Sequence, residues 1–206
     1  AAYVRGIQSQ GVYACPKHFA VNSQELRRMA MNAVVDERTL REIYLTGFEI
    51  AVKEGHAKAI MTSYNEVNGT YANENKHLLQ DILRNEWGFD GIVITDWGAS
   101  NDHVKGVAAG SDLEMPTPGF DSARQLIAAV KDGGITEKEI DECVDHMLDA
   151  ILTLTAKKKE KKTSFDEKAH HALAKKAAAE SAVLLKNTDH ILPLKAGTKV
   201  AVIGDC

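Results

Sequence analysis

Polar side chains that could carry out chemistry stand where short apolar runs of the sequence end. Lys17 and His18 follow the run 11–15, and Asp96 follows the run 91–95. A carboxylate at the edge of an apolar strand stays ionised only when donors surround it, and Lys17 and His18 are suitable donors. An ionised carboxylate in a cleft can attack an anomeric carbon, so Asp96 is a candidate nucleophile.

Two further apolar runs end in the same way. Tyr64 follows the run 57–63, and Glu114 lies near the end of the run 111–115. In a parallel β/α barrel, the carboxyl ends of the strands converge on one mouth, where active sites are built. Four runs ending in polar side chains therefore predict one shared site.

Each of these residues also has a structural interpretation. Asp96 taken alone could cap a helix that follows its strand. Trp97 offers an aromatic face to the apolar side of a sugar ring, although a lone Trp more often packs in a core. For Glu66, Glu74 and Glu114, a solvated or structural role is favoured over that of a local acid.

The elements expected to position these residues alternate between strand and helix. The apolar runs named above predict strands, and the helices are expected at 37–53, 78–86, 121–131 and 137–155. Asp36 is placed to cap the first helix, and Thr136 with Glu139 has the spacing of a capping box. The alternation predicts an α/β fold, a parallel sheet or barrel with helices outside.

A charged run interrupts this pattern at 157–162 and predicts a solvated linker. An Ala-rich helix is expected at 166–181, and the apolar run 199–204 is expected to be the first buried strand of a new α/β domain. We therefore expect a boundary between a first domain, 1–156, and a second, 166–206.

Composition narrows the class of protein. The chain has 206 residues, 44% of them hydrophobic, with a net charge of -4 and a pI near 6.1, so neither a nucleic acid nor an anionic membrane is an expected partner. Its three cysteines form no C-x-x-C pair, and no H-E-x-x-H, G-x-G-x-x-G or P-loop motif occurs, so no metal and no cofactor is expected. The chain opens with Ala1 rather than Met, which indicates a truncated chain.

Several motifs, in this order and spacing, resemble glycoside hydrolase family 3 over nearly all of the chain. They are Lys17-His18-Phe19 with Arg28, Asp36 to Tyr44, Met61-Thr62-Ser63-Tyr64-Asn65 with Asn68-Gly69, Trp87-Gly88-Phe89, Thr95-Asp96-Trp97, and Asp112-Leu113 with Met115-Pro116. The resemblance implies that Asp96 forms the covalent glycosyl-enzyme intermediate. It implies that Lys17 and His18 bind sugar hydroxyls and that Tyr64 stands close to the nucleophile. It also implies substrate-binding or positioning roles for Met61, Trp97 and Arg28.

The same resemblance implies the architecture and the substrate. Residues 1–156 would be the C-terminal part of a TIM-type (β/α)8 barrel, 157–165 a linker, and 166–206 the start of an α/β sandwich domain. The first half of the barrel is expected before Ala1 and the acid/base Glu beyond Cys206, so this fragment alone should be nearly inactive. The glucosidase-like branch is favoured, because the Pro-Gly that N-acetylglucosaminidases carry after their Lys-His is absent here. The expected substrate is a β-glucoside or short oligosaccharide with a terminal glucose, and xylosides stay open.

Two other functions are retained as alternatives. Lys17 could be the Schiff-base nucleophile of a barrel lyase, or the chain could be a noncatalytic sugar-binding fragment. The open sheet edges of a half barrel favour association with the missing half and second domain, or with a second copy as a homo-oligomer. The compartment stays open, with the cytoplasm favoured.

Overall fold

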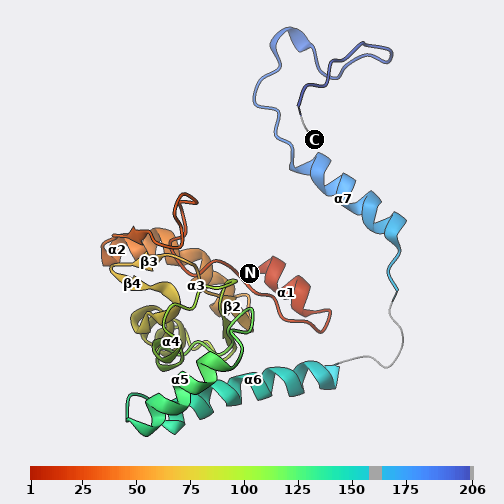
Figure 1. The fold of residues 1–206 in the computed structure, drawn as a ribbon. Helices are drawn as coiled ribbons and strands as arrows, with labels where there is room; N and C mark the ends of the chain where they lie inside the picture. Colours follow the sequence, from red (N-terminus) through yellow and green to blue (C-terminus); the bar gives the residue numbers. More distant parts are fainter. Residues whose placement is uncertain (158–163, 205–206) are drawn as a thin grey trace. The chain divides into compact units, whose positions relative to one another are not determined.

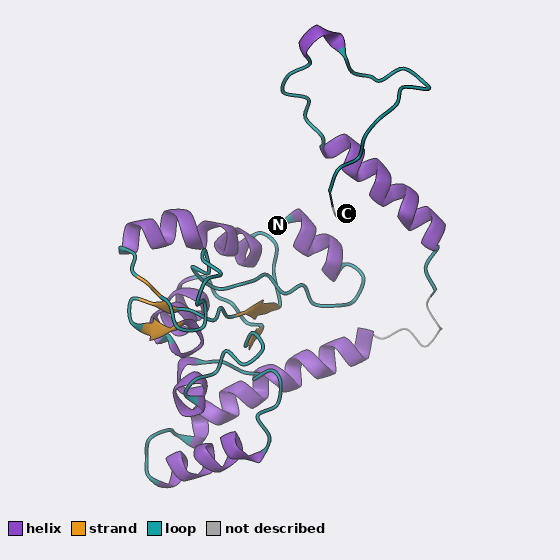
Figure 2. Cartoon of the chain, turned by 45° about the horizontal axis from the view of Figure 1, so that its top comes forward, coloured by secondary structure: helices purple, strands orange, loops and turns teal. Residues whose placement is uncertain are grey.

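The protein is described by a computed structural model that covers residues 1–157 and 164–204. The chain divides into two units, Ala1–Lys158 and Lys159–Cys206 (Figure 1). Helices and loops make up most of the described chain, and the strands are short (Figure 2). No helix in the described ranges is long and apolar enough to cross a membrane.

Two parallel strands lie at the centre of the first unit. Strand β2 (Ala59–Met61) pairs with β5 (Ile92–Ile94) along its whole length. Gly91 enters β5 so close to β2 that a Cβ there would lie 2.3 Å from the carbonyl oxygen of Lys58. The predictions of strands within 57–63 and 91–95 are confirmed.

One extended segment flanks each side of this pair. Phe19 forms a parallel bridge to Thr62, and Leu113 forms a parallel bridge to Ile94. The segments thus lie side by side in chain order, as consecutive strands of a parallel α/β sheet do.

The strand predicted at 11–15 was wrong, and the strand predicted at 111–115 was wrong in extent. Residues 9–12 turn after helix α1 (Ala2–Gln8), and the chain reaches the sheet only at Pro16, whose carbonyl accepts from the Met61 N–H at 3.1 Å. The predicted strand 111–115 is reduced to the single bridge at Leu113. The Val93 N–H donates to the side chain of Asp112 at 2.7 Å. In a longer pair of strands, this N–H would instead donate to a backbone carbonyl of the neighbouring strand.

Helices lie at all four ranges predicted in the first unit. They are α2 (Glu37–Thr39), the π-helical segment η1 (Leu40–Leu45) and α3 (Thr46–Lys53), which run on from one another, then η3 (His77–Glu86, also π-helical), α5 (Phe120–Lys131) and α6 (Glu137–Lys157). Helices α1 and α4 (His103–Ala109) were not predicted. The Asp36 carboxylate accepts from the Thr39 N–H at 3.0 Å. The Thr136 hydroxyl accepts from the Glu139 N–H at 3.2 Å, and the Glu139 carboxylate accepts from the Thr136 N–H at 2.8 Å. Both predicted caps are therefore confirmed.

A small sheet that the sequence did not predict lies beside this layer. It consists of β1 (Asn32–Ala33), β3 (Glu66–Val67) and β4 (Thr70–Tyr71), in the order β1-β3-β4. Asn68 makes the β3–β4 turn, and its side-chain amide bonds both the N–H and the C=O of Val35 at 2.9 Å. The short helix η2 (Ala72–Glu74) follows β4 and leads into η3.

The core lies between the parallel strands and the helices. Its largest fully buried side chains include Phe19, Leu40, Leu45, Ile60, Leu78, Leu79, Ile82, Leu83 and Val93. The Phe19 ring meets the rings of Phe48 and Trp87 edge to face, with centroids 5.1 and 6.0 Å apart. The segment that carries Lys17 and His18 is thereby fixed against the helices.

A buried charge cluster ties the end of the sheet to two helices. The Asp112 side chain is fully buried, and its carboxylate lies 2.7 Å from Arg84 Nη2 and 2.9 Å from His146 Nδ1. Arg84 belongs to η3 and His146 to α6, so one carboxylate holds both helices to the strand region. Burial, and then the Asp112 charge, raise the pKa of the neighbouring Cys143 thiol to about 12. That thiol is therefore protonated and unreactive at neutral pH.

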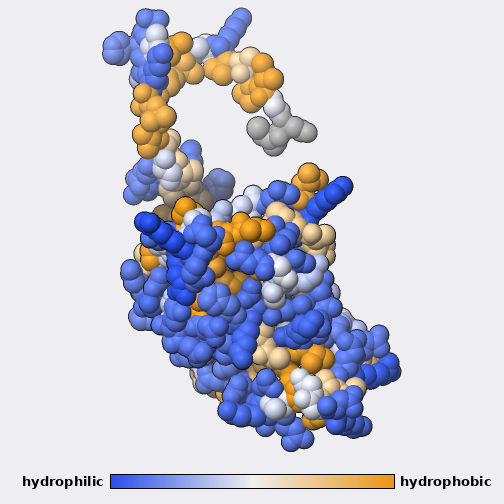
Figure 3. Space-filling view, turned by 90° about the vertical axis from the view of Figure 1, so that its left-hand side faces the viewer, coloured by the Kyte–Doolittle hydropathy of each residue, from blue (hydrophilic) through white to orange (hydrophobic). Residues whose placement is uncertain are grey.

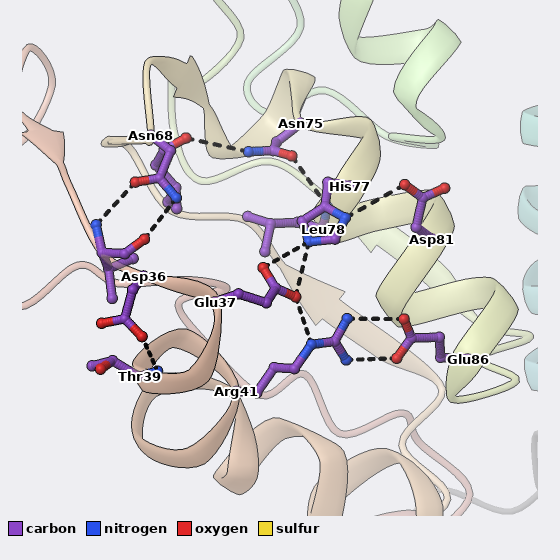
Figure 4. A network of polar contacts seen from close by, with 12 residues as sticks. Asp36, Glu37, Thr39, Arg41, Asn68, Asn75, His77, Leu78, Asp81 and Glu86 are labelled. Atoms are coloured by element: carbon purple, nitrogen blue, oxygen red, sulfur yellow. Dashed lines mark hydrogen bonds and ion pairs between the residues drawn. The ribbon is translucent and has the colours of Figure 1, made fainter.

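A second polar network lies on the surface between α2–η1 and η3 (Figure 4). The Arg41 guanidinium donates to both oxygens of Glu86, at 2.6 and 2.9 Å, and to Glu37 at 2.5 Å. His77 Nε2 lies 3.1 Å from Glu37, and His77 Nδ1 lies 3.5 Å from Asp81. The network braces two helices that are distant in the sequence.

Replacing Glu86 by glutamine should weaken the Arg41–Glu86 interaction and lower the stability of the fold in a pH-dependent way. The hydrogen bond from Arg41 lowers the pKa of Glu86 below its usual 4.5. Because the folded-state pKa is depressed, the ionised carboxylate stabilises the fold above about pH 4.5, and this contribution is lost as the pH falls through the lower folded value. We expect Glu86→Gln to reduce the free energy of unfolding by up to about 1 kcal/mol at pH 7 and by almost nothing near pH 2.

Urea denaturation at the two pH values measures this difference, and Glu54→Gln is the matched control. Glu54 is an exposed carboxylate whose side chain makes no hydrogen bond or ion pair with the described residues. An equal effect of Glu86→Gln at both pH values would contradict a role for the ion pair.

The second unit has little internal packing. It holds α7 (Glu167–Ser181), which confirms the helix predicted at 166–181 and is capped by Asp166, and the short helix η4 (Thr188–His190). The predicted strand at 199–204 was wrong, because the described residues of that stretch form no strand, and Val202 and Ile203 are 84% and 94% exposed. A strand needs a neighbouring strand for its N–H and C=O groups, and the described part of this unit offers none. Apolar groups consequently lie on its surface (Figure 3).

The predicted linker at 157–165 falls largely on 158–163, which lie outside the described residues. Helix α6 extends to Lys157, two residues beyond the predicted end.

Candidate active site

The candidate residues gather where the parallel segments end. His18 precedes Phe19 of the first segment, Tyr64 lies three residues beyond the end of β2, and Asp96 lies two residues beyond the end of β5. This is the end of the sheet at which the sequence predicted one shared site.

The Asp96 carboxylate has one polar neighbour at each oxygen. His18 Nε2 lies 3.1 Å from Oδ2, and the Trp97 N–H donates to Oδ1 at 2.7 Å. The side chains of Asp96 and His18 are 14% and 27% exposed. The Trp97 hydrogen bond, which has a charged acceptor, therefore restricts the orientation of this largely shielded carboxylate.

Tyr64 completes the surroundings of Asp96. Its side chain is buried, and its hydroxyl donates to the carbonyl oxygen of Trp97 at 3.0 Å. Burial first, and then the nearby negative charge of Asp96, raise the pKa of Tyr64. The phenol therefore keeps its proton and remains a hydrogen-bond donor beside the carboxylate.

Arg28 reaches the site through Tyr64. Its guanidinium carbon lies 4.7 Å from the centre of the Tyr64 ring, and it forms an ion pair with Glu25 at 2.7 Å. A guanidinium over an aromatic face is attracted by the ring electrons, so Arg28 holds the Tyr64 ring in place.

The other three predicted residues surround the site without contacting Asp96 through their side chains. Two residues, Lys17 and His18, were expected beside Asp96. Only His18 lies next to the carboxylate, and the exposed Lys17 forms no ion pair with Asp96 in the described structure. Met61 is half-buried at the end of β2, and Trp97 is 54% exposed. Lys17 and Trp97 thus present free surface, which a bound molecule can contact.

The remaining carboxylates near the site have structural partners. Glu114 lies 2.8 Å from Nδ1 of His103, and Glu74 accepts from the N–H groups of Asn101 and Asp102. The structural interpretation of these two residues is supported by their contacts. No group of three or more His, Cys, Asp or Glu side chains in the described residues is arranged to hold a metal ion.

Sequence reasoning missed the groups that hold the backbone around Asp96. The Thr95 hydroxyl accepts from the Met115 N–H at 2.8 Å, and the Met115 carbonyl accepts from the Gly98 N–H, also at 2.8 Å. These contacts join the segment after β5 to its neighbour across the sheet. The sequence feature that could have indicated these contacts is that Thr95 directly precedes Asp96.

Known proteins resemble this chain along most of its length. Residues 1–150 match the glycosyl hydrolase family 3 N terminal domain. A thermostable beta-glucosidase B from Acetivibrio thermocellus is 50% identical over 204 residues, which cover 99% of this chain and 27% of that protein. An exo-alpha-(1->6)-L-arabinopyranosidase from Bifidobacterium longum is 44% identical over 211 residues, covering 98% of this chain and 28% of that protein.

The fold has a counterpart among solved structures as well. Beta-glucosidase 3B from Thermotoga neapolitana, solved in complex with glucose, matches with a TM-score of 0.87 and 41% identity over 94% of this chain and 28% of that one. The α/β fold of the first unit is therefore that of these relatives. The chain spans 27–28% of the length of the relatives named here.

Proposed function

The chain belongs to glycosyl hydrolase family 3, and from this premise we propose that it forms part of a retaining β-glycoside hydrolase with Asp96 as the nucleophile. The observation that carries the proposal is the Asp96 carboxylate at the end of β5, with His18 on one oxygen and the Trp97 N–H on the other. This carboxylate is 14% exposed, so part of it remains accessible to a substrate.

The proposed reaction is a double displacement. An Asp96 oxygen attacks the anomeric carbon while the bond to the leaving oxygen breaks, and that oxygen takes a proton from a general acid. A water molecule then attacks the same carbon, gives its proton to the acid group acting as a base, and restores the Asp96 carboxylate. We propose that the acid/base is a Glu of the same polypeptide outside these residues, because Glu74 and Glu114 are both engaged in structural contacts.

The remaining residues are proposed to bind the sugar. Lys17 and His18 would hydrogen-bond hydroxyls of the terminal residue, and the exposed Trp97 ring would face the apolar side of the sugar or its leaving group. Met61 would form part of the wall. Tyr64 would donate beside the nucleophile, with Arg28 holding its ring.

We further propose that the parallel segments are the C-terminal part of a (β/α)8 barrel and that 166–206 begins an α/β sandwich domain. Support comes from the parallel order of the four segments and from the length of the relatives, of which this chain covers only part. The missing half and the second domain would then be partners within one polypeptide, and the activity would belong to the complete protein.

The proposed substrate is a β-glucoside or short oligosaccharide with a terminal non-reducing glucose, because the most similar relative named above is a beta-glucosidase. An α-L-arabinopyranoside is the second candidate, since a relative at 44% identity is named for that substrate. Comparing kcat/KM on the nitrophenyl derivatives of the two sugars would separate them.

A mechanism-based label tests the role of Asp96. The complete polypeptide is incubated with 2-deoxy-2-fluoro-β-glucosyl fluoride, digested and analysed by mass spectrometry. We expect the label on the peptide that contains Asp96, because the fluorine slows hydrolysis of the covalent intermediate. A label on another residue, or none from an enzyme that turns over ordinary glucosides, would overturn the assignment. Reduction with borohydride in the presence of substrate should leave Lys17 unmodified, which excludes the lyase alternative.

A further inference from the structure

The loop that leaves Asp96 is anchored at its far end by a carboxylate from another part of the chain. Oε1 of Glu74 accepts from the N–H of Asn101 at 3.0 Å and from the N–H of Asp102 at 2.7 Å. Two successive backbone N–H groups thus converge on one side-chain oxygen of Glu74.

The near end of this loop orients Asp96 directly. The Trp97 N–H donates to the Asp96 carboxylate, and the Ala99 N–H donates to the Asp96 carbonyl at 3.0 Å. Asp102 closes the loop by capping α4, where its carboxylate accepts from the Lys105 N–H at 3.0 Å. The loop is short, so a shift at Asn101 and Asp102 is transmitted to the N–H that holds Asp96.

The short helix η2, which carries Glu74, is fixed in the core. Glu74 ends η2, whose other residues, Ala72 and Asn73, are fully or almost fully buried. Helix α4 packs on η2 so closely that a Cβ at Gly106 would lie 3.0 Å from the side-chain nitrogen Nδ2 of Asn73. Glu74 therefore joins the loop to a fixed part of the core.

We propose that Glu74 is a positioning residue for the nucleophile: by fixing the end of the 97–102 loop, it keeps the Trp97 N–H aimed at Asp96. The inference rests on the proposed function, in which Asp96 attacks the sugar. Catalytic rates are sensitive to displacements of about 1 Å, which cost up to roughly a hundredfold. Glu74 acts through the loop and touches neither substrate nor reacting atoms.

The test compares variants of the complete enzyme in their reaction with the fluoroglucosyl reagent. We expect Glu74→Ala to lower the rate constant of Asp96 labelling by about 10- to 100-fold, with the dissociation constant of the reagent changed by less than about threefold. Glu74→Gln keeps an acceptor oxygen at the same reach and should restore the rate to within about threefold of the wild type. Glu54→Ala removes an exposed carboxylate and should leave the rate unchanged.

Amide hydrogen exchange adds a readout for the loop itself. Exchange at Asn101 and Asp102 should be faster in Glu74→Ala than in the wild type and close to the wild type in Glu74→Gln. If Glu74→Ala does not fold, Glu74→Asp provides the same test, because it keeps the charge but is one methylene too short to reach both N–H groups.

The outcomes separate this inference from the proposed function. A wild type that is not labelled at Asp96 would overturn the proposed function itself. A wild type that is labelled at Asp96, together with a Glu74→Ala or Glu74→Asp variant labelled equally fast, would overturn the positioning role alone. The same holds if Glu74→Gln is as slow as Glu74→Ala while its melting temperature matches the wild type.

Discussion

Asp96→Asn is expected to lower kcat on a β-glucoside by about 10⁴- to 10⁶-fold in the complete enzyme, the range measured when catalytic residues of a covalent mechanism are removed. An amide keeps the size of the side chain and can still accept from the Trp97 N–H. It has lost the negative charge and cannot form the ester to the anomeric carbon. The fold should therefore persist while the first chemical step is lost.

Steady-state kinetics with a nitrophenyl β-glucoside measure this effect, and Asp90→Asn is the matched control. The Asp90 carboxylate is 71% exposed and pairs with Lys58 at the surface, so its replacement should leave kcat unchanged. An Asp96→Asn enzyme with more than a few per cent of the wild-type rate would show that another group forms the intermediate.

A smaller side chain at the same position allows a chemical rescue. In Asp96→Gly, azide can enter the vacated space, attack the anomeric carbon from that face and displace the leaving group, giving an α-glucosyl azide. Formation of the β-glucosyl azide instead would place the nucleophile on the other face of the sugar and would exclude Asp96.

Asp112→Ala should produce the largest loss of stability. The substitution removes a fully buried carboxylate and leaves the Arg84 guanidinium, itself only 10% exposed, without its charged partner. It also removes the acceptors for the Val93 N–H and for His146. Breaking a buried ion pair in this way costs about 3–5 kcal/mol of the free energy of unfolding, because an uncompensated charge remains in the interior.

Urea denaturation measures this loss, with Asp121→Ala as the matched control. The Asp121 side chain is 75% exposed and pairs with Arg124 on the surface of α5, so its removal should cost below about 1 kcal/mol. A second comparison isolates the charge: Arg84→Met combined with Asp112→Leu should be more stable than Asp112→Ala alone, because no unpaired charge is then buried. A double variant that is no more stable than the single one would show that the lost hydrogen bonds, not the orphaned guanidinium, dominate.

Predictions from the sequence were most accurate where a structure is determined by neighbouring residues. Asp36 caps its helix through an N–H three residues away, and the Thr136–Glu139 box closes over the same distance. The predicted helices were located to within two residues at their ends, whereas α1 and α4 were not predicted. Such contacts depend on local backbone geometry, which the types and spacing of a few residues are sufficient to indicate.

The extent of the strands was predicted less well. The apolar runs at 11–15 and 199–204 have the composition of strands, yet neither forms one in the described structure. A strand exists only when a second chain segment lies alongside it, and the sequence of one segment contains no information about its neighbour. The small sheet β1-β3-β4 was missed for the same reason.

The candidate site depends both on residue types, which can be read from the sequence, and on contacts between distant segments, which cannot. The residue types at the ends of the apolar runs, together with the family motifs, were sufficient to single out Asp96, His18 and Tyr64. The sequence could not show that His18 rather than Lys17 contacts Asp96, that Glu74 holds the loop beyond it, or that Asp112 joins two helices to the sheet. Each of these contacts joins residues that are distant along the chain, and their distance in space follows only from how the intervening helices pack against the core.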